Sequence, residues 1–190
     1  MSNLDLKNYI GLYHSAIPAN VCSTLVSESK DFNWKLFDWS NIKNRKVSKS
    51  EAYEIGCDTC ELLPPKFKLI LNPLISDVIE DYRKTYAEHL SSTMGFSNVK
   101  LNRYNTGTKL KKHVDHIHSL FDGQRKGIPT FSIVGLLNED FEGGNFVFWD
   151  DYIAPLKTGT IVVFPSNFLY PHRVDTIKKG IRHSFVSWVW

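Results

Sequence analysis

The sequence predicts a mainly β protein of the α+β class, in which N-terminal helices support a β-sandwich or β-barrel formed by the C-terminal half. Two segments before residue 95 place apolar residues at helical spacing, and six short runs after Gly95 have the composition of strands. The chain has 190 residues, 42% of them hydrophobic, which is enough for one buried core. It contains no internal repeat, low-complexity tract or linker. We therefore expect a single domain over residues 1–190.

The two predicted helices cover residues 15–30 and 65–90. The apolar stripe of the second is interrupted at Asn72-Pro73, which either kinks the helix or marks its true start. Such a stripe packs most simply on a sheet, so residues 1–95 are expected to form a helical support region. Residues 31–63 show no clear periodicity and are expected to be irregular.

The predicted strands follow Gly95 and are separated by turn residues such as Gly and Asn. They comprise residues 99–105, 110–116, 130–137, 145–149, 160–164 and 182–190. Short strands with this punctuation are typical of sandwiches and barrels. We place the β core at residues 96–190.

Charge and hydropathy argue against nucleic acid and membrane as partners. The net charge of +3 arises from 23 basic and 20 acidic residues that are mixed along the chain, so no basic face for nucleic acid is visible. Residues 1–10 lack the apolar core of a signal peptide, and no later stretch has the apolar length of a membrane span. We expect a soluble, cytoplasmic protein.

The cysteine content favours a reducing compartment, because three cysteines are an odd number and argue against a disulfide framework. Cys57 and Cys60 form a lone CxxC motif, but structural zinc needs four ligands and no second pair exists. We interpret this spacing as chance, and a metal or redox role is the alternative.

A candidate metal edge lies at His113-Val114-Asp115. Residues two apart on an extended strand leave the same face, so the imidazole and the carboxylate would point the same way. His172, which follows the strand 160–164 and a turn-like segment, is the candidate third ligand. Two histidines and one carboxylate on one face of a metal leave other positions open, which suits non-haem Fe(II). His113, Asp115 and His172 are therefore the predicted metal and catalytic residues.

Arg182 supports this interpretation by its position ten residues after His172, at the start of the strand 182–190. A guanidinium buried beside a metal needs an anion, and its planar fork suits a carboxylate. A dicarboxylate cosubstrate would supply that group.

Three motifs occur in order along the C-terminal half. They are LNRYNTGTKLKKHVD at 101–115, LLNEDFEGGNFVF at 136–148, and KTGTIVVFPSNFLYPHRV with GIRHSFVSW within 157–188. Together they resemble the motifs of prolyl 4-hydroxylases and their bacterial and viral relatives, within the Fe(II)/2-oxoglutarate-dependent dioxygenases. The resemblance implies a double-stranded β-helix (jelly-roll) core with N-terminal helices packed on one sheet.

The resemblance also implies an activity and its cofactors. His113, Asp115 and His172 would ligate Fe(II), and Arg182 would pair with the distal carboxylate of 2-oxoglutarate. With O2, and with ascorbate as a further cofactor, the enzyme would hydroxylate an unactivated C–H bond. The implied substrate is a prolyl residue in a peptide or protein, although the wider family also modifies other side chains and free amino acids.

Further pocket residues follow from the same resemblance. Tyr104 matches a tyrosine that reaches the cosubstrate from the side, Trp188 matches a tryptophan near the metal, and Ser184 would add a hydroxyl to the carboxylate clamp. One position departs from the pattern: many relatives place a tyrosine where this chain has Leu136. We therefore expect fewer donors at the distal end of the cosubstrate.

Two other functions compete with this interpretation. An AlkB-type nucleic-acid demethylase shares an NRYxxGxxxxxHxD-like segment, but its second arginine is missing, since no arginine follows Arg182. A non-catalytic jelly-roll binding module would have lost metal ligands, whereas all three are present here. The sequence leaves open the substrate and the oligomeric state, and residues 40–60 and 116–128 are the expected lids.

Overall fold

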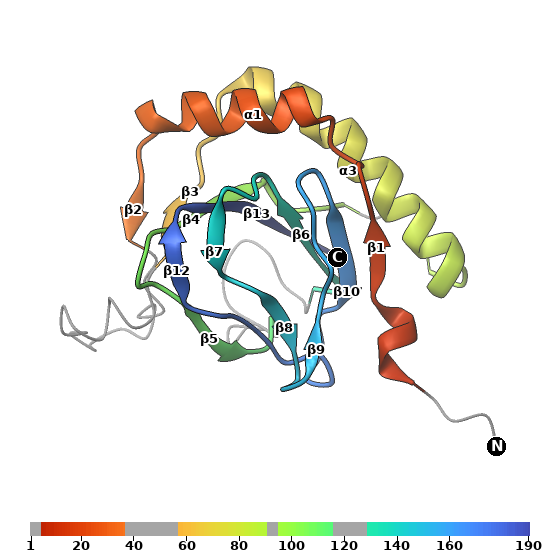
Figure 1. Cartoon of the computed structure of the whole chain (residues 1–190). Helices are drawn as coiled ribbons and strands as arrows, with labels where there is room; N and C mark the ends of the chain where they lie inside the picture. The colour runs from red at the N-terminus through yellow and green to blue at the C-terminus, as the bar shows by residue number, and fades with distance from the viewer. Residues whose placement is uncertain (1–4, 37–56, 91–94, 116–128) are drawn as a thin grey trace, which may run out of the picture.

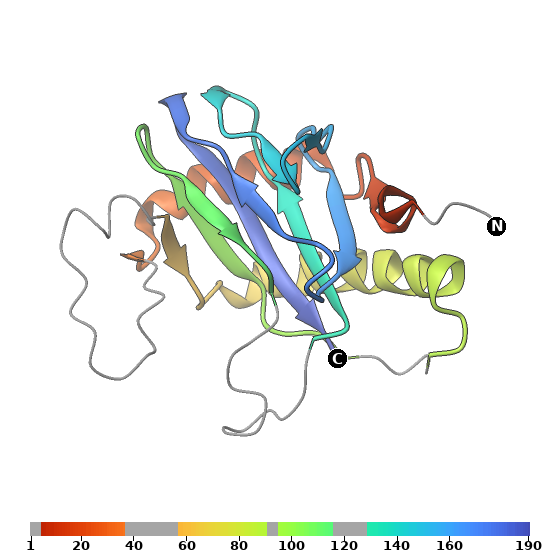
Figure 2. The same ribbon diagram turned by 90° about the horizontal axis from the view of Figure 1, so that it is seen from below.

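The computed structural model describes residues 5–36, 57–90, 95–115 and 129–190. Two α-helices lie along one face of a large sheet, and further strands lie on its other side (Figure 1). Seen from below, the helices lie behind the strands (Figure 2). The order of layers is therefore helices, major sheet and minor sheet.

The helices are the 3-10 turn η1 (Leu6–Tyr9), α1 (Ala19–Glu28), the 3-10 turn η2 (Ser29–Asp31) and α3 (Pro65–Tyr86). α3 begins at Pro65, where the missing N–H of proline costs nothing, and continues through Pro73 to Tyr86. Asn72-Pro73 is therefore neither the start nor the end of this helix. No helix in the described ranges is both long enough and apolar enough to cross a membrane.

The major sheet has the strand order β1-β10-β6-β13-β4-β3-β2, and every neighbouring pair is antiparallel. Its strands are β1 (Gly11–Tyr13), β10 (Ile161–Pro165), β6 (Phe131–Leu136), β13 (Arg182–Val189), β4 (Lys100–Tyr104), β3 (Asp58–Cys60) and β2 (Lys35–Leu36). The long central strand β13 therefore lies between β6 and β4.

The minor sheet has the order β5-β11-β8-β9, and a separate two-stranded sheet joins β12 to β7. These strands are β5 (Leu110–His113), β11 (His172–Val174), β8 (Phe146–Phe148), β9 (Tyr152–Ile153), β12 (Ile177–Gly180) and β7 (Phe141–Gly143). Two facing antiparallel sheets form the jelly-roll architecture, so the predicted fold class is confirmed, with both α-helices on the major sheet.

Side-chain alternation along the strands divides the interior into two apolar layers. The outer layer, between the helices and the major sheet, includes Leu25, Phe67, Leu71, Ile133 and Phe185. The inner layer, between the two sheets, includes Tyr104, Val134, Phe146, Phe148 and Phe164. On β13, Phe185 points to the helices, whereas its neighbours Ser184 and Val186 point to the inner side. The inner face is where the predicted site residues gather.

Each of the six predicted strand regions contains a strand, but the expectation of an irregular segment over 31–63 was wrong in part. β2 and β3 lie in that segment and pair with each other and with β4. With β1 they bring strands from the predicted helical support region into the major sheet. Strands of two or three residues are too short to show a periodic pattern, which is why they escaped prediction. Residues 40–56 and 116–128, part of the expected lids, lie outside the described residues.

Candidate metal centre

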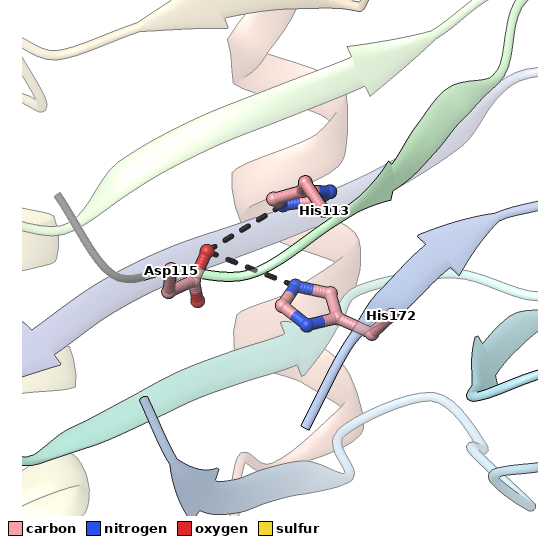
Figure 3. A group of neighbouring side chains, drawn as sticks. All are labelled: His113, Asp115 and His172. Atoms are coloured by element: carbon pink, nitrogen blue, oxygen red, sulfur yellow. Dashed lines mark ion pairs between the residues drawn. The ribbon is translucent and has the colours of Figure 1, made fainter. Parts of the chain in front are cut away.

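Three candidate ligands meet on the inner side of the minor sheet (Figure 3). His113 ends β5 and His172 begins β11, and the two residues are direct antiparallel partners. Asp115 follows two residues after His113. Its Oδ1 lies 3.5 Å from His113 Nε2 and 3.7 Å from His172 Nε2. Ligand atoms bound to one ion at about 2.0–2.2 Å lie roughly 3–4 Å apart, so the spacing fits a single metal.

Backbone carbonyls orient both imidazoles. His113 Nδ1 lies 2.8 Å from the Lys111 carbonyl oxygen, and His172 Nδ1 lies 3.1 Å from that of Tyr170. A carbonyl can only accept, so in each neutral ring the proton is assigned to Nδ1, and the lone pair is left on Nε2. Both Nε2 atoms face Asp115. In metal sites, a hydrogen bond to one nitrogen of a histidine commonly orients the ring so that the other nitrogen binds the metal.

The protonation states also suit a metal. Burial lowers the pKa of His172 to about 4 despite the nearby Asp115 carboxylate, so this ring is neutral at pH 7. Burial alone would raise the pKa of Asp115, but its interactions with the imidazoles of His172 and His113 outweigh burial and hold that pKa below its usual range. The site therefore combines a neutral imidazole with a carboxylate that stays ionised.

Phenylalanine rings enclose the metal centre on one side. The ring centroids of Phe146, Phe148 and Phe164 lie 5.2, 5.9 and 4.9 Å from that of His172. These rings exclude water and explain why His172 is only 3% exposed. A low local dielectric strengthens charge interactions with a bound ion.

Arg182 lies on the inner face of the major sheet and is 1% exposed. It pairs across the strands with Tyr104, and its guanidinium carbon lies 5.3 Å from the centre of that ring. Its Nη1 donates to Ser184 Oγ at 2.7 Å, whereas Nε and Nη2 have no hydrogen-bond partner among the described residues. Ser184 thus lies beside the guanidinium. Nε and Nη2 are buried donors of a cation, and a carboxylate would accept hydrogen bonds from both of them.

Trp188 and Leu136 line the same inner face. Trp188 lies on β13, an even number of residues from Arg182, and its buried Nε1 has no partner. Leu136 is the cross-strand neighbour of Ser184 and is 3% exposed. An apolar side chain therefore occupies the place where relatives were expected to have a tyrosine.

Sequence reasoning missed two neighbours of the site. Ser132 contributes to lowering the pKa of Asp115, and its hydroxyl lies 2.7 Å from that of Ser166. Cys57 belongs to the inner layer together with Tyr104. Ser132 lies on a buried strand in which every second residue shares one face, and this alternation was a weak sequence signal for its position. No sequence signal indicated Cys57, because its neighbours in the fold are distant in sequence.

Comparison with known proteins assigns this half of the chain to a family. Residues 99–190 match the model of the 2OG-Fe(II) oxygenase superfamily, and the matched range contains the three candidate ligands and Arg182. Residues 99–190 belong to this superfamily. Its description names Fe(II) and 2-oxoglutarate, the groups expected from the motifs.

The curated relatives are bacterial hydroxylases. A PKHD-type hydroxylase of Idiomarina loihiensis is 36% identical over 94 residues, which cover 48% of this chain and 41% of the relative. Another, of Rippkaea orientalis, is 32% identical over 92 residues, covering 46% of this chain and 40% of that relative. The matched segment thus spans about two fifths of the length of these relatives.

Solved structures share the fold over nearly the whole chain. A viral collagen prolyl hydroxylase from Paramecium Bursaria Chlorella virus-1 has a TM-score of 0.67 at 16% identity, covering 95% of this chain and 94% of that one. A prolyl-4-hydroxylase of Pseudomonas putida has a TM-score of 0.67 at 18% identity, with 94% and 91% covered. A Trichoplax adhaerens prolyl hydroxylase, solved with a hypoxia inducible factor peptide, has a TM-score of 0.70 at 11% identity, with 96% and 84% covered. At these identities the likeness establishes the jelly-roll fold.

Proposed function

We propose that the protein is an Fe(II)- and 2-oxoglutarate-dependent dioxygenase that hydroxylates a prolyl residue in a peptide or protein. One observation carries the proposal: the cluster of His113, Asp115 and His172 shares the space between the sheets with Arg182, a buried cation with two donors that no described residue pairs. A metal triad next to an arginine that lacks an anion matches the family's requirement for a metal and a dicarboxylate.

The donor set fits the groups that the family implies. His113, Asp115 and His172 would hold Fe(II), and Asp115 Oδ2 is a buried oxygen without a hydrogen-bond partner. Arg182 would bind the distal carboxylate of 2-oxoglutarate, flanked by Ser184 and Tyr104. When bound, iron and cosubstrate supply the oxidation of a C–H bond by O2, coupled to decarboxylation of 2-oxoglutarate to succinate.

The chain's own residues contribute orientation and a dry environment. The two backbone carbonyls hold the imidazoles with Nε2 inward, so the ligands need little reorganisation on binding a metal. The phenylalanine rings keep water from the metal's surroundings, which limits side reactions. Asp115 supplies a negative charge, which imidazole ligands lack.

The choice of a prolyl substrate rests on the relatives. Three solved structures that share the fold are prolyl hydroxylases, and one of them holds a peptide. We include ascorbate in the proposal as the reductant that keeps iron in the Fe(II) state. Omitting ascorbate from the assay tests that part alone, since only the number of turnovers should fall.

Anaerobic titration tests the metal and cosubstrate. Fe(II) with 2-oxoglutarate should give a weak visible charge-transfer band in the wild-type chain and in His14→Ala, which removes a histidine that contacts Thr160 elsewhere in the fold. The band and succinate production should both be lost in His113→Ala and His172→Ala. A folded wild-type chain without the band would favour a non-catalytic binding module. Succinate production by His113→Ala would show that the metal edge is wrong.

Mass spectrometry of turnover mixtures tests the substrate. Proline-rich peptides and free amino acids are offered separately, and a gain of one oxygen that depends on 2-oxoglutarate is sought. We expect this gain on prolyl residues of peptides. Gain on a free amino acid, and never on a peptide, would refute the prolyl-peptide part and leave the dioxygenase part intact.

A further inference from the structure

The segment between β10 and β11 leads directly into the metal ligand His172. It covers residues 166–171, and the carbonyl oxygens of its last three residues all accept hydrogen bonds. The middle one, that of Tyr170, lies 3.1 Å from His172 Nδ1 and orients the ring whose other nitrogen faces Asp115 (Figure 3). The direction of this carbonyl therefore decides where His172 Nε2 points.

Trp149 holds the carbonyls on both sides of that one. Its indole Nε1 donates to the Leu169 oxygen at 2.8 Å, and its backbone N donates to the Pro171 oxygen at 2.8 Å. The Trp149 carbonyl oxygen accepts from Arg173 Nη1 at 3.2 Å, on the other side of His172 in the chain. Because the peptide units before and after the middle carbonyl are both fixed, that carbonyl has little freedom to rotate.

The backbone of Trp149 indicates that this side chain is required at its position. Trp149 has a φ of 53°, in the left-handed region that bulky residues rarely adopt and that persists only where the surroundings enforce it. The ring centroids of Phe148, Tyr152 and Tyr170 lie 5.8, 6.3 and 5.9 Å from that of Trp149. These contacts explain an aromatic ring here, whereas the bond to the Leu169 carbonyl requires an N–H.

We propose that Trp149 is a positioning residue of the metal centre: its two N–H groups fix the peptide units that flank the Tyr170 carbonyl, and this carbonyl then holds His172 with Nε2 towards the metal. The inference rests on the proposed function. Trp149 acts through a backbone carbonyl and not on the metal itself, so its effect should appear in metal affinity and in the geometry of the bound ion.

Trp34 provides a matched control in the outer layer. Its Nε1 donates to the Ser29 carbonyl oxygen at 2.7 Å, which is the same kind of bond at nearly the same length. Both tryptophans are partly buried, but Trp34 packs between the helices and the major sheet, whereas Trp149 packs in the inner layer. Trp34→Phe should therefore lower stability about as much as Trp149→Phe does, without affecting the metal.

The test compares Trp149→Phe, Trp149→His and Trp34→Phe in the full chain. Trp149→Phe keeps an aromatic ring and removes the N–H. Trp149→His loses more apolar area, but its Nε2 takes the place of the indole nitrogen on a five-membered ring and can donate. Calorimetric titration with Co(II), without O2 or 2-oxoglutarate, should show metal affinity about fivefold to tenfold weaker in Trp149→Phe. Trp149→His and Trp34→Phe should lie within about threefold of wild type.

A second readout separates positioning from a general loss of stability. The visible absorption of bound Co(II) depends on the arrangement of its ligands, so it should change in Trp149→Phe and stay as in wild type in the other two variants. Urea unfolding of the metal-free chains should rank them differently, with Trp149→His the least stable because it buries the least apolar area. If Trp149 only supported the fold, metal affinity would follow stability and Trp149→His would bind most weakly.

Three outcomes would overturn the positioning role while the proposed function stands. They are a Trp149→Phe chain that binds Co(II) as wild type does, an equal loss of affinity in Trp34→Phe, and a loss in Trp149→His as large as that in Trp149→Phe. If Trp149→Phe did not fold, a folded Trp149→His chain with affinity about tenfold below wild type would overturn it equally, since that variant keeps the donor. A folded wild-type chain that binds neither Co(II) nor Fe(II) would overturn the proposed function together with this inference.

Discussion

Replacing Arg182 by Met should stabilise the metal-free, cosubstrate-free chain and abolish cosubstrate binding. Arg182 is 1% exposed, and within the described part of the chain its single hydrogen bond goes from Nη1 to Ser184 at 2.7 Å. Burial lowers the pKa of its guanidinium, a sign that the folded chain holds this charge at a cost. Methionine fills similar apolar volume and carries no charge.

Comparing the desolvation penalty of the guanidinium with its interactions predicts that Arg182→Met is more stable than the wild-type chain. A buried ion keeps an effective desolvation penalty of several kcal/mol, whereas the Ser184 hydrogen bond and the contact with the Tyr104 ring return about 1–3 kcal/mol together. We therefore expect the free energy of unfolding to rise by about 1–3 kcal/mol. Binding should fall at least about 100-fold, since a bidentate, charge-assisted pair with the carboxylate is lost.

Arg103 provides the matched control. It lies one residue from Tyr104 on the opposite face of the same sheet and is paired with Asp58 at 2.8 Å. Arg103→Met leaves that half-buried carboxylate unpaired, so the free energy of unfolding should fall by about 1–3 kcal/mol. The two arginine substitutions should thus change stability in opposite directions.

Urea unfolding in the presence of a chelator measures both effects. Thermal unfolding with a redox-inert divalent metal and added 2-oxoglutarate then reports binding, because a ligand of the folded state raises its stability. The wild-type chain should show this increase and Arg182→Met should not. A loss of stability in Arg182→Met as large as that in Arg103→Met would mean that Arg182 already has a structural counter-charge, and the reasoning would fail.

Two further predictions concern stability. The pKa of His172 is about 4 in the folded chain against 6.5 as its ordinary value, so between these pH values the unfolded chain binds a proton that the folded chain does not. The free energy of unfolding of the metal-free chain should therefore fall as the pH is lowered from 6.5 to 4, by roughly 3 kcal/mol from this group, with a further loss from His183, whose pKa is also about 4. Urea unfolding at several pH values checks it, and a flat profile would contradict it. Gly135→Ala should cost about 1–3 kcal/mol, because a Cβ there would overlap the Phe185 ring packed on it; Phe185→Leu should relieve part of this cost, and no loss in the alanine variant would count against the packing.

The architecture and the pairing of His113 with Asp115 on one face could be predicted from the sequence because they depend on local order. Apolar spacing of three and four marked both α-helices, and short punctuated runs marked the central strands. His113 and Asp115 stand two apart, and that period alone implies a shared face on an extended chain. His172 and Arg182 were candidates by their positions along the chain, whereas Tyr104, Ser184 and Trp188 required the family resemblance, since spacing alone does not tell a pocket residue from a packing residue.

Tertiary structure decided what depends on partners far apart in the chain. The register of β3 with β4 joins Asp58 to Arg103, 45 residues apart, and thereby brings Cys57 beside Tyr104. No local pattern encodes that pairing, because β3 has only three residues and follows a segment without periodicity. That no described carboxylate pairs with Arg182 is likewise a property of the folded interior, since it depends on which residues the strands bring within reach. Local periodicity thus determined the strands and the shared face of His113 and Asp115. Long-range pairing of those strands determined which residues lie together between the sheets.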